Sequence, residues 1–416
     1  MNKPMAMDPS AIWKDPGMPA SPSTARAIND RLALRLLQQD GPLTATQLKA
    51  LTGLSRPTVA DLVDRLQDAG LVRVVGESGS DRRGPNARLY GIVADRAHLA
   101  ALDVRTDGVA VAVADLLGTT LAESTLPIAG GTGTRPAVER AVAMLERTAR
   151  RAGTAPLHSV GIGAPGLIDP VTGELRNTAG LPAWHGDLVR ELQQRLSATV
   201  LVENETNLAA VAEHRIGAAR DRDTFVLLWL GHGIGAAVML DGKLRRGASG
   251  GAGEIGFLPV PGTSGIPSAV NCAGGFHSLV GSAAVCELAA EHGIRAGGPS
   301  VDEAQEKDPA AAFAVRAALR ADDADAEAFL SALADRLALG AASVVSVLDP
   351  GCLVLAGEVG RAGGEALAAR VEERLARMSP LRTEVRAGTL GGGAVLRGGL
   401  FAAREAAQEA LFAPGE

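Results

Sequence analysis

The tetrapeptide Ser55-Arg56-Pro57-Thr58 carries the most specific chemistry in the sequence. An arginine can donate two hydrogen bonds to a guanine edge, and short hydroxyl side chains reach bases or phosphates. The tetrapeptide opens an amphipathic segment, where Ser55 can cap a helix and Pro57 costs no hydrogen bond. We therefore predict a DNA-reading helix start with Arg56 as the main base reader.

Three further arginines, Arg82, Arg83 and Arg88, lie in and after a stretch rich in Gly, Ser and Asp. Guanidinium groups on an exposed hairpin would contact phosphates or enter the minor groove and give a salt-dependent affinity for DNA. The alternative is a small helical protein-interaction domain with an ordinary solvated hairpin. The helix start and the arginine-rich tip together favour DNA.

The elements that position these side chains follow from hydrophobic spacing and from glycine and proline signals. A helix over Ala45–Leu51 ends at Thr52-Gly53, a second helix starts at Ser55, and strands over Leu71–Val75 and Ala87–Ile92 form a hairpin. A preceding helix, Ala25–Gln39, is expected to pack beneath them through Ile28, Leu32, Leu36 and Ala33. This pattern predicts a winged helix-turn-helix over residues 24–95, after a proline-rich disordered tail at 1–23.

Composition limits the class of protein. The 416 residues carry a net charge of −6, but residues 1–95 hold 12 Lys and Arg against 10 Asp and Glu, so the front is mildly basic and the body acidic. Three scattered cysteines are too few for a disulfide framework, and we find no signal peptide or apolar run of membrane-spanning length. We expect a cytoplasmic protein with no membrane partner.

The body contains two similar strand–turn–strand units. The first, within residues 98–117, places Asp103 at the end of an apolar strand, and the second, within 224–244, has the turn Gly231-His232-Gly233-Ile234-Gly235. Helical segments separate the two units. The repetition predicts an α/β body of two duplicated halves with a cleft between them.

These features resemble the ROK family (repressors, open reading frames, kinases), and the resemblance covers nearly all of residues 25–410. The matching segments are Ala101–Gly108 and Leu230–Val238, which resemble two phosphate loops, Gly161–Pro170, the Glu-Asn-Asp-like Leu201–Ala210, Gly250–Phe257 and Leu348–Gly360. The resemblance implies an actin/hexokinase-like two-lobed domain over 96–416, with lobe one at about 96–213 plus the C-terminal helix and lobe two at about 214–394. Members with an added winged helix are transcriptional regulators, often repressors relieved by a sugar.

Three departures from the family's kinases argue against catalysis. The kinase general base is an aspartate, but Glu205 stands at that position, and a catalytic group moved by roughly a methylene can lose about a hundredfold in rate. Arg105 replaces a glycine of the first phosphate loop, and His232 replaces a threonine of the second. We therefore expect no enzyme, no catalytic residue and no cofactor.

The zinc site of the family is also altered. Phe257 stands at the position of its histidine, and Ala269, Asn271 and Phe276 stand at its three cysteine positions. A shift of one residue would bring in Cys272, but one cysteine with a nearby His277 does not make the four ligands of a structural zinc site. We expect no metal, with Phe257 and Phe276 forming an apolar plug instead.

Asn204, Glu205 and Glu254 remain as candidate ligands for sugar hydroxyls. Other sugar contacts of the family are missing, since Gly180 and Ser278 replace an asparagine and a glutamate. Asn204 and Glu205 could equally be hinge hydrogen-bonding groups, and Glu254 could be a surface or interlobe ion-pair partner.

The resulting hypothesis is a repressor that binds a double-stranded DNA operator as a homodimer or homotetramer and senses a small sugar-like effector. One alternative is an ATP-dependent sugar kinase with an appended DNA-binding head. Another is a regulator whose cleft binds no small molecule and which responds to a protein partner.

Overall fold

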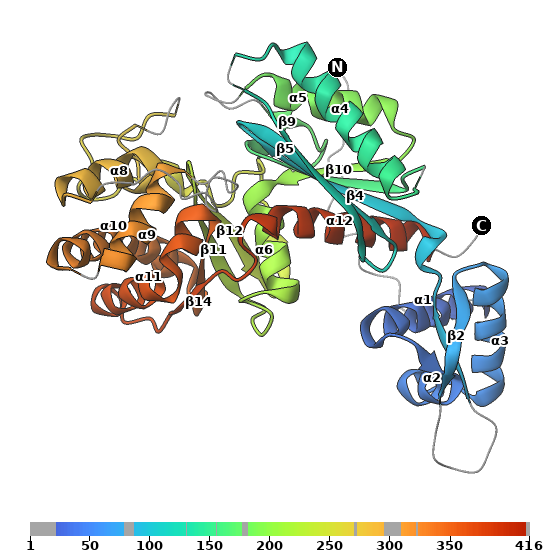
Figure 1. Cartoon of the computed structure of the whole chain (residues 1–416). Coiled ribbons are helices and arrows are strands. Elements are labelled where there is room, and N and C mark those ends of the chain that lie inside the picture. Colours follow the sequence, from blue (N-terminus) through green and yellow to red (C-terminus); the bar gives the residue numbers. More distant parts are fainter. Residues whose placement is uncertain are drawn as a thin grey trace, which may run out of the picture. The chain divides into compact units, whose positions relative to one another are not determined.

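The computed structural model describes residues 22–78, 87–129, 131–154, 156–176, 182–269, 273–294, 309–321 and 323–412. The chain divides into two compact units (Figure 1). The first comprises residues up to Arg96 together with the chain from Gln408, and the second runs from Ala97 to Ala407. Most of the tail predicted at residues 1–23 lies outside the described residues, and the first helix begins at Pro22.

The first unit is a winged helix-turn-helix, which confirms the prediction. Its elements are α1 (Pro22–Asp40), β1 (Leu43–Thr44), α2 (Ala45–Thr52), α3 (Arg56–Asp68), β2 (Val72–Ser78) and β3 (Ala87–Ile92), and the sheet order is β1-β3-β2. Thr44 and Gln47 form a capping box at the start of α2, and Gly53 ends that helix with a φ of 70°. The turn between α2 and α3 therefore has its conformation fixed by local sequence.

The buried face of α1 agrees with the prediction at Ala33 and differs at Ile28 and Leu32. Ala33, Leu34 and Leu37 lie in the core of the unit, whereas Ile28 is 59% exposed and Leu32 is 39% exposed. The sequence has two overlapping apolar stripes, and the packing of α1 against α2, α3 and β3 selects the one centred on Leu34.

Lobe one of the second unit is built on a five-stranded sheet in the order β10-β7-β4-β5-β6. Its strands are β4 (His98–Arg105), β5 (Gly108–Asp115), β6 (Thr120–Pro127), β7 (Ser159–Ala164) and β10 (Thr199–Asn204), after the short turn η2 (Ala94–Arg96). The helices α4 (Thr134–Arg151) and α5 (Trp184–Arg195) share a core with this sheet, and β8 (Leu167–Ile168) pairs with β9 (Leu175–Arg176) beside it. Because β4, β7 and β10 are parallel neighbours, their carboxyl ends meet at one edge.

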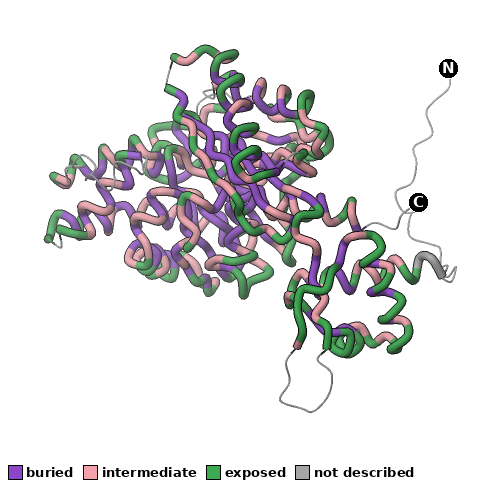
Figure 2. Tube along the Cα trace, turned by 45° about the vertical axis from the view of Figure 1, so that its right-hand side comes forward, coloured by how far each residue is buried: buried purple, intermediate pink, exposed green. Residues whose placement is uncertain are grey.

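Lobe two repeats this plan with the sheet order β13-β12-β11-β14-β15. Its strands are β11 (Phe225–Leu230), β12 (Ile234–Leu240), β13 (Lys243–Arg245), β14 (Cys352–Ala356) and β15 (Glu384–Ala387). Its helices are η3 (Ile255–Phe257), α7 (His277–Val280), α8 (Ser282–Glu291), α9 (Ala310–Ala321), α10 (Ala324–Leu348) and α11 (Gly357–Met378). Figure 2 shows buried chain gathered in the interior of the second unit, and the strands β4, β5, β7, β11 and β14 are almost wholly buried.

The helix α10 is long and apolar enough to span a membrane by length and composition alone, a feature that we did not expect from the sequence. Its side chains explain this composition. Phe329, Leu333 and Leu337 are buried in the core of lobe two, where they pack with residues of α8, α9 and α11. In this structure α10 is the central core helix of a lobe.

Two helices connect the lobes of the second unit. The helix α6 (Glu205–Ile216) contacts β7 and β10 of lobe one as well as β11 and β12 of lobe two. The helix α12 (Ala394–Leu411), which follows η5 (Gly391–Gly393), crosses α6 so closely that an added Cβ at Gly398 would lie 2.0 Å from the carbonyl oxygen of Leu208. The predicted duplicated, two-lobed α/β architecture is therefore confirmed.

Candidate functional site

The start of α3 presents the predicted DNA-reading residues. Ser55 caps the helix, since its Oγ accepts a hydrogen bond from the backbone N–H of Thr58 at 3.3 Å. Its hydroxyl oxygen also lies 2.8 Å from the hydroxyl oxygen of Thr58, so the two side chains form a hydrogen bond with each other. Arg56 and Pro57 are exposed. Within the tetrapeptide, Arg56 offers the most donors for a base, because one hydroxyl hydrogen of the Ser55–Thr58 pair is used in their own hydrogen bond.

The hairpin arginines are only partly described. Arg82 and Arg83 lie outside the described residues, between β2 and β3. Arg88 is exposed on β3, where it pairs in register with Glu77 of β2. The predicted phosphate contacts therefore rest, in the described part of the hairpin, on Arg88.

In the second unit, the parallel strands bring acidic residues to one sheet edge. Asp103 of β4 and Glu203 of β10 are both in register with Gly163 of the strand between them. Glu203 is committed to structure, because it accepts hydrogen bonds from Asn207 Nδ2 at 2.9 Å and from Arg246 Nε at 2.6 Å. Asp103 is 2% exposed and directly faces an arginine.

That arginine is Arg105, in the first of the two loops that bind phosphate in the family's kinases. Its Nη2 lies 2.6 Å from Asp103 Oδ2 and donates to the carbonyl oxygen of Gly392 at 3.0 Å. Burial raises the pKa of the Asp103 carboxyl, and the guanidinium opposes that shift. Arg105 thus places an ion pair and a backbone contact within this loop.

A histidine that sequence reasoning missed supports the same loop. His185, in the first turn of α5, is fully buried, and its Nε2 lies 3.2 Å from the carbonyl oxygen of Arg105. Burial lowers its pKa to about 4, so the imidazole is neutral at pH 7. Its signal in the sequence was a polar side chain directly after Trp184 at the start of an apolar helix face.

Asn204 acts as the N-cap of α6. Its Oδ1 accepts from the backbone N–H of Thr206 at 2.9 Å, and its Nδ2 donates to the carbonyl oxygen of Gly166 at 3.1 Å. Both ends of the amide are therefore bonded to the protein. This geometry favours the hinge role over direct ligand binding for Asn204.

Glu205 is the first residue of α6 and lies over β7, with its Cα 3.7 Å from the position of a Cβ built on Gly163. Its Oε2 is enclosed and has no hydrogen-bond partner among the described residues. Burial raises the pKa of this carboxyl to about 8, and the nearby carboxylates of Asp103, Glu254 and Glu358 add to the shift. We refer to Asp103, Glu205, Glu254 and Glu358 as the carboxylate cluster.

The second kinase phosphate loop also holds a protein carboxylate. Glu358, near the start of α11, has its Oε2 only 2.5 Å from the position of a Cβ built on Gly231. His232, next in the loop, is exposed. A side chain this close to Gly231 occupies space that a polyphosphate would need at this loop.

The region of the family's zinc site is apolar in part. Phe276 is fully buried and packs so tightly on Gly340 that an added Cβ there would lie 2.2 Å from its ring, whereas Phe257 is half-buried. Asn271 and Cys272 lie outside the described residues, and Ala269 offers no ligand atom in its side chain. Within the described ranges, no three His, Cys, Asp or Glu side chains are grouped to hold a metal.

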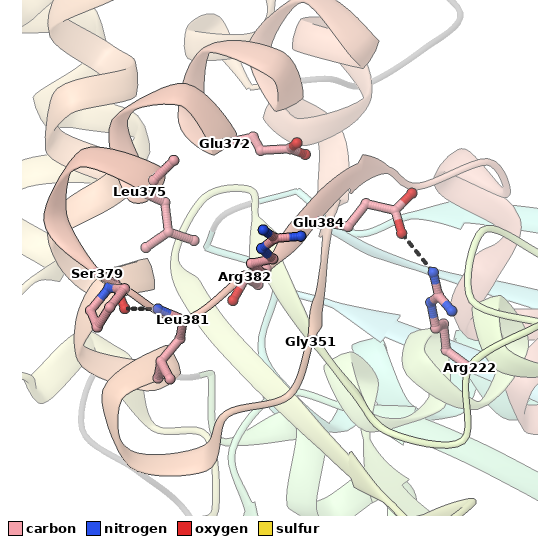
Figure 3. Close-up of a pocket in the computed structure, with 11 residues that line it drawn as sticks. Arg222, Gly351, Glu372, Leu375, Ser379, Leu381, Arg382 and Glu384 are labelled. Carbon is pink, nitrogen blue, oxygen red and sulfur yellow. Dashed lines mark hydrogen bonds and ion pairs between the residues drawn. The ribbon is translucent and has the colours of Figure 1, made fainter.

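A pocket of about 510 Å³ lies elsewhere in lobe two, beside the end of α11 and the amino ends of β14 and β15 (Figure 3). The carboxylate cluster lies toward the opposite, carboxyl ends of the strands. In the pocket, Glu384 pairs with Arg222 at 2.9 Å and with Arg386 at 2.9 Å, while Glu372 accepts from the backbone N–H of Val385. We assign no ligand to this pocket, because these charges are engaged with the protein itself.

Comparison with known proteins agrees with this geometry. Residues 99–406 match the ROK family. The chain belongs to the ROK family. Residues 28–84, within the winged helix-turn-helix, match the MarR family.

Sequence relatives of the chain are named as repressors or transcriptional regulators. The xylose repressor of Caldicellulosiruptor bescii is 24% identical over 334 residues, covering 79% of this chain and 83% of its own. The dual regulator NagC of Escherichia coli K12 is 26% identical over 243 residues, covering 56% of this chain and 58% of its own. These relatives and the MarR-type head identify a ROK transcriptional repressor, with operator DNA as its partner, rather than an enzyme.

Solved structures show the same fold. A ROK transcriptional regulator, a homologue of the E. coli MLC protein, superimposes with a TM-score of 0.73 at 21% identity and covers 93% of this chain and 98% of its own. A ROK glucokinase from Streptomyces griseus, solved with glucose and AMPPNP, gives a TM-score of 0.62 at 25% identity. The match covers 74% of this chain and 99% of the glucokinase chain. The glucokinase covers a smaller share of this chain than the regulator does.

Proposed function

We propose that the carboxylate cluster binds a small sugar-like effector, and that occupancy of this site controls the affinity of the repressor for its operator. The observation that carries the proposal is Glu205 Oε2, an enclosed oxygen that has no hydrogen-bond partner in the described part of the chain. A buried polar atom left unsatisfied costs about 1–3 kcal/mol, and a ligand hydroxyl would remove that cost. Glu254, which is exposed nearby, would add a second carboxylate, and Asn204 would hold the start of α6 in place.

On the DNA side, Arg56 would read a base edge, while Ser55, Pro57 and Thr58 shape the helix start. Arg82, Arg83 and Arg88 would contact the phosphate backbone. We propose a cytoplasmic homodimer or homotetramer, whose two-fold pairing of α3 helices requires half-sites separated by whole turns of about ten base pairs each. Effector binding would change lobe closure, and with it the spacing of the two α3 helices.

Ligand-dependent stability tests the effector. A panel of pentoses, hexoses and N-acetylhexosamines should include a compound that stabilises the full chain, since a ligand at a hundred times its dissociation constant adds about 2.7 kcal/mol. The same compound should release the operator in gel shifts. Glu205→Ala should lose the stabilisation and keep operator binding, whereas Glu123→Ala, at an exposed glutamate on β6, should keep both.

If no sugar in the panel stabilises the chain, this proposal is overturned. The remaining hypothesis is then a regulator that responds to a protein partner. The kinase alternative is disfavoured by Arg105 and Glu358, which occupy the two phosphate loops with an ion pair and a carboxylate.

A further inference from the structure

The exposed face of α3 is acidic beyond its first turn. Val59, Leu62, Val63 and Leu66 bury one side of the helix. On the opposite side the helical repeat aligns Pro57, Asp61, Asp64 and Asp68, all of them exposed. If α3 reads DNA as proposed, this exposed stripe is the face turned toward the major groove.

Of the basic residues of α3, Arg65 interacts electrostatically with Asp61 but makes its hydrogen bonds elsewhere. Arg65 is held by Asp30 of α1, with one hydrogen bond of 2.6 Å and another of 3.3 Å. Arg56 stands at the first turn, exposed. Among the described residues none donates a hydrogen bond to Asp61, so its carboxylate retains its full acceptor capacity.

A carboxylate in the major groove discriminates between bases by charge and by hydrogen bonding. Guanine presents two acceptors there and thymine presents an acceptor and a methyl group, so both disfavour a carboxylate. Adenine offers an amino donor beside the acceptor N7, whereas cytosine offers its N4 amino group. Cytosine is therefore the base that a groove-facing aspartate selects.

We propose that Asp61 is a specificity-determining residue that selects a cytosine in each operator half-site. The inference rests on the proposed groove-reading role of α3 and extends it to a named base. Asp61 lies five residues after Arg56, roughly 7.5 Å along the helix at 1.5 Å per residue. Base pairs stack about 3.4 Å apart. At this separation Asp61 and Arg56 contact different base pairs.

The carboxylate also has an effect on DNA of any sequence. It repels phosphates, so it weakens non-specific binding, and the amino group of cytosine compensates for this cost at the correct site. Removal of the charge should therefore raise affinity for random DNA while discrimination falls. If Asp61 only lay on a solvated helix face, its substitution would change neither the affinity for random DNA nor the discrimination between bases.

The test is a selection of binding sites from random DNA with the full-length wild type, Asp61→Ala and Asp68→Ala, followed by affinity measurements on the selected operator and its single-base variants. Asp68 is the matched control, because it is an exposed aspartate on the same stripe at the last position of α3. For the wild type, replacing the critical cytosine with thymine should weaken binding about 10-fold or more. For Asp61→Ala the same replacement should change affinity less than about 3-fold, and random DNA should bind several-fold tighter.

Identical base preferences for wild type and Asp61→Ala at every position would overturn the assignment. A changed preference in Asp68→Ala equal to that in Asp61→Ala would also overturn it, because the effect would then come from net charge. If the wild type selects no sequence at all, the proposed reading role of α3 fails instead, and circular dichroism of each variant separates loss of folding from loss of reading.

Discussion

At the scale of single residues, burial changes the acid–base chemistry of Glu205. With a pKa of about 8 its carboxyl is protonated at pH 7, whereas its ordinary pKa is 4.5. Folding therefore retains a proton that the unfolded chain releases above pH 4.5. The resulting stability is fully present below pH 4.5 and is lost as the pH rises toward 8.

Glu205→Gln should remove this pH dependence, because glutamine stays neutral. We expect the variant to match the wild type in free energy of unfolding at pH 4 and to exceed it by on the order of 2 kcal/mol at pH 8, after solvent screening is allowed for. Urea denaturation at a series of pH values measures the difference. The control is Glu123→Gln, at the exposed glutamate on β6, which should follow the wild type throughout.

The arginines of the first unit should separate into two classes. Arg56→Ala should cost about 1–3 kcal/mol on the operator and relax preference at one base. Arg88→Ala should weaken binding to all sequences alike and reduce the salt slope by about 1. Binding affinities are measured by fluorescence anisotropy at a series of salt concentrations. If Arg56→Ala loses the same affinity for random DNA as for the operator, Arg56 is not the base reader.

At the scale of elements, Glu213 holds α6 to the segment before α12. This side chain is buried and accepts hydrogen bonds from the backbone N–H groups of Ala218 at 2.7 Å, Thr389 at 2.9 Å and Leu390 at 3.0 Å. The carbonyl oxygen of Gly392, in the same segment, accepts a hydrogen bond from Arg105 of lobe one. One carboxylate therefore ties the end of α6 to the segment that leads into α12.

Glu213→Ala should destabilise the protein by about 2–4 kcal/mol, because it leaves buried N–H groups without an acceptor. Denaturant unfolding of the full chain provides the value. Glu139→Ala, at an exposed glutamate of α4, is the matched control and should cost less than about 0.5 kcal/mol. A Glu213 variant as stable as this control would show that Ala218, Thr389 and Leu390 find other acceptors.

Local signals explain which elements could be predicted from the sequence. The cap at Ser55, the turn at Gly53 and the end of α3 before Gly70 depend on residues a few positions apart, and they were predicted correctly. The buried face of α1 was not, because the stripes of Ile28 and Leu34 differ only in what packs against them. Local sequence could not decide between them.

Much of the candidate site depends on residues far apart in the chain. The positions of Glu358 and His185 depend on strand ends that meet only in the folded protein, so their roles at the two phosphate loops were missed. Asn204 was predicted as a ligand group from the family resemblance. The cap that it forms on α6 uses both ends of its amide, and only the geometry shows this.

At the scale of the whole molecule, the two phosphate loops predict loss of kinase chemistry. The full chain with Mg-ATP and a panel of sugars should give no turnover above the buffer rate, because Arg105 and Glu358 occupy the loops and Glu205 is protonated. Combining Arg105→Gly with Glu358→Gly should allow Mg-ATP to stabilise the chain in thermal unfolding, without restoring turnover. Phosphoryl transfer by the wild type would contradict the assignment as a non-enzymatic repressor.

The helix α12 covers the sheet of lobe one: Ser159 Oγ of β7 donates to the carbonyl oxygen of Ala403, and a Cβ built on Gly399 would lie 2.9 Å from that of Ala101. During synthesis, strands made early must therefore wait until α12 has left the ribosome before their apolar surface is covered. The DNA-binding head emerges long before that moment. Premature termination near residue 390 should consequently yield a chaperone-bound, aggregation-prone product in place of a soluble truncated repressor.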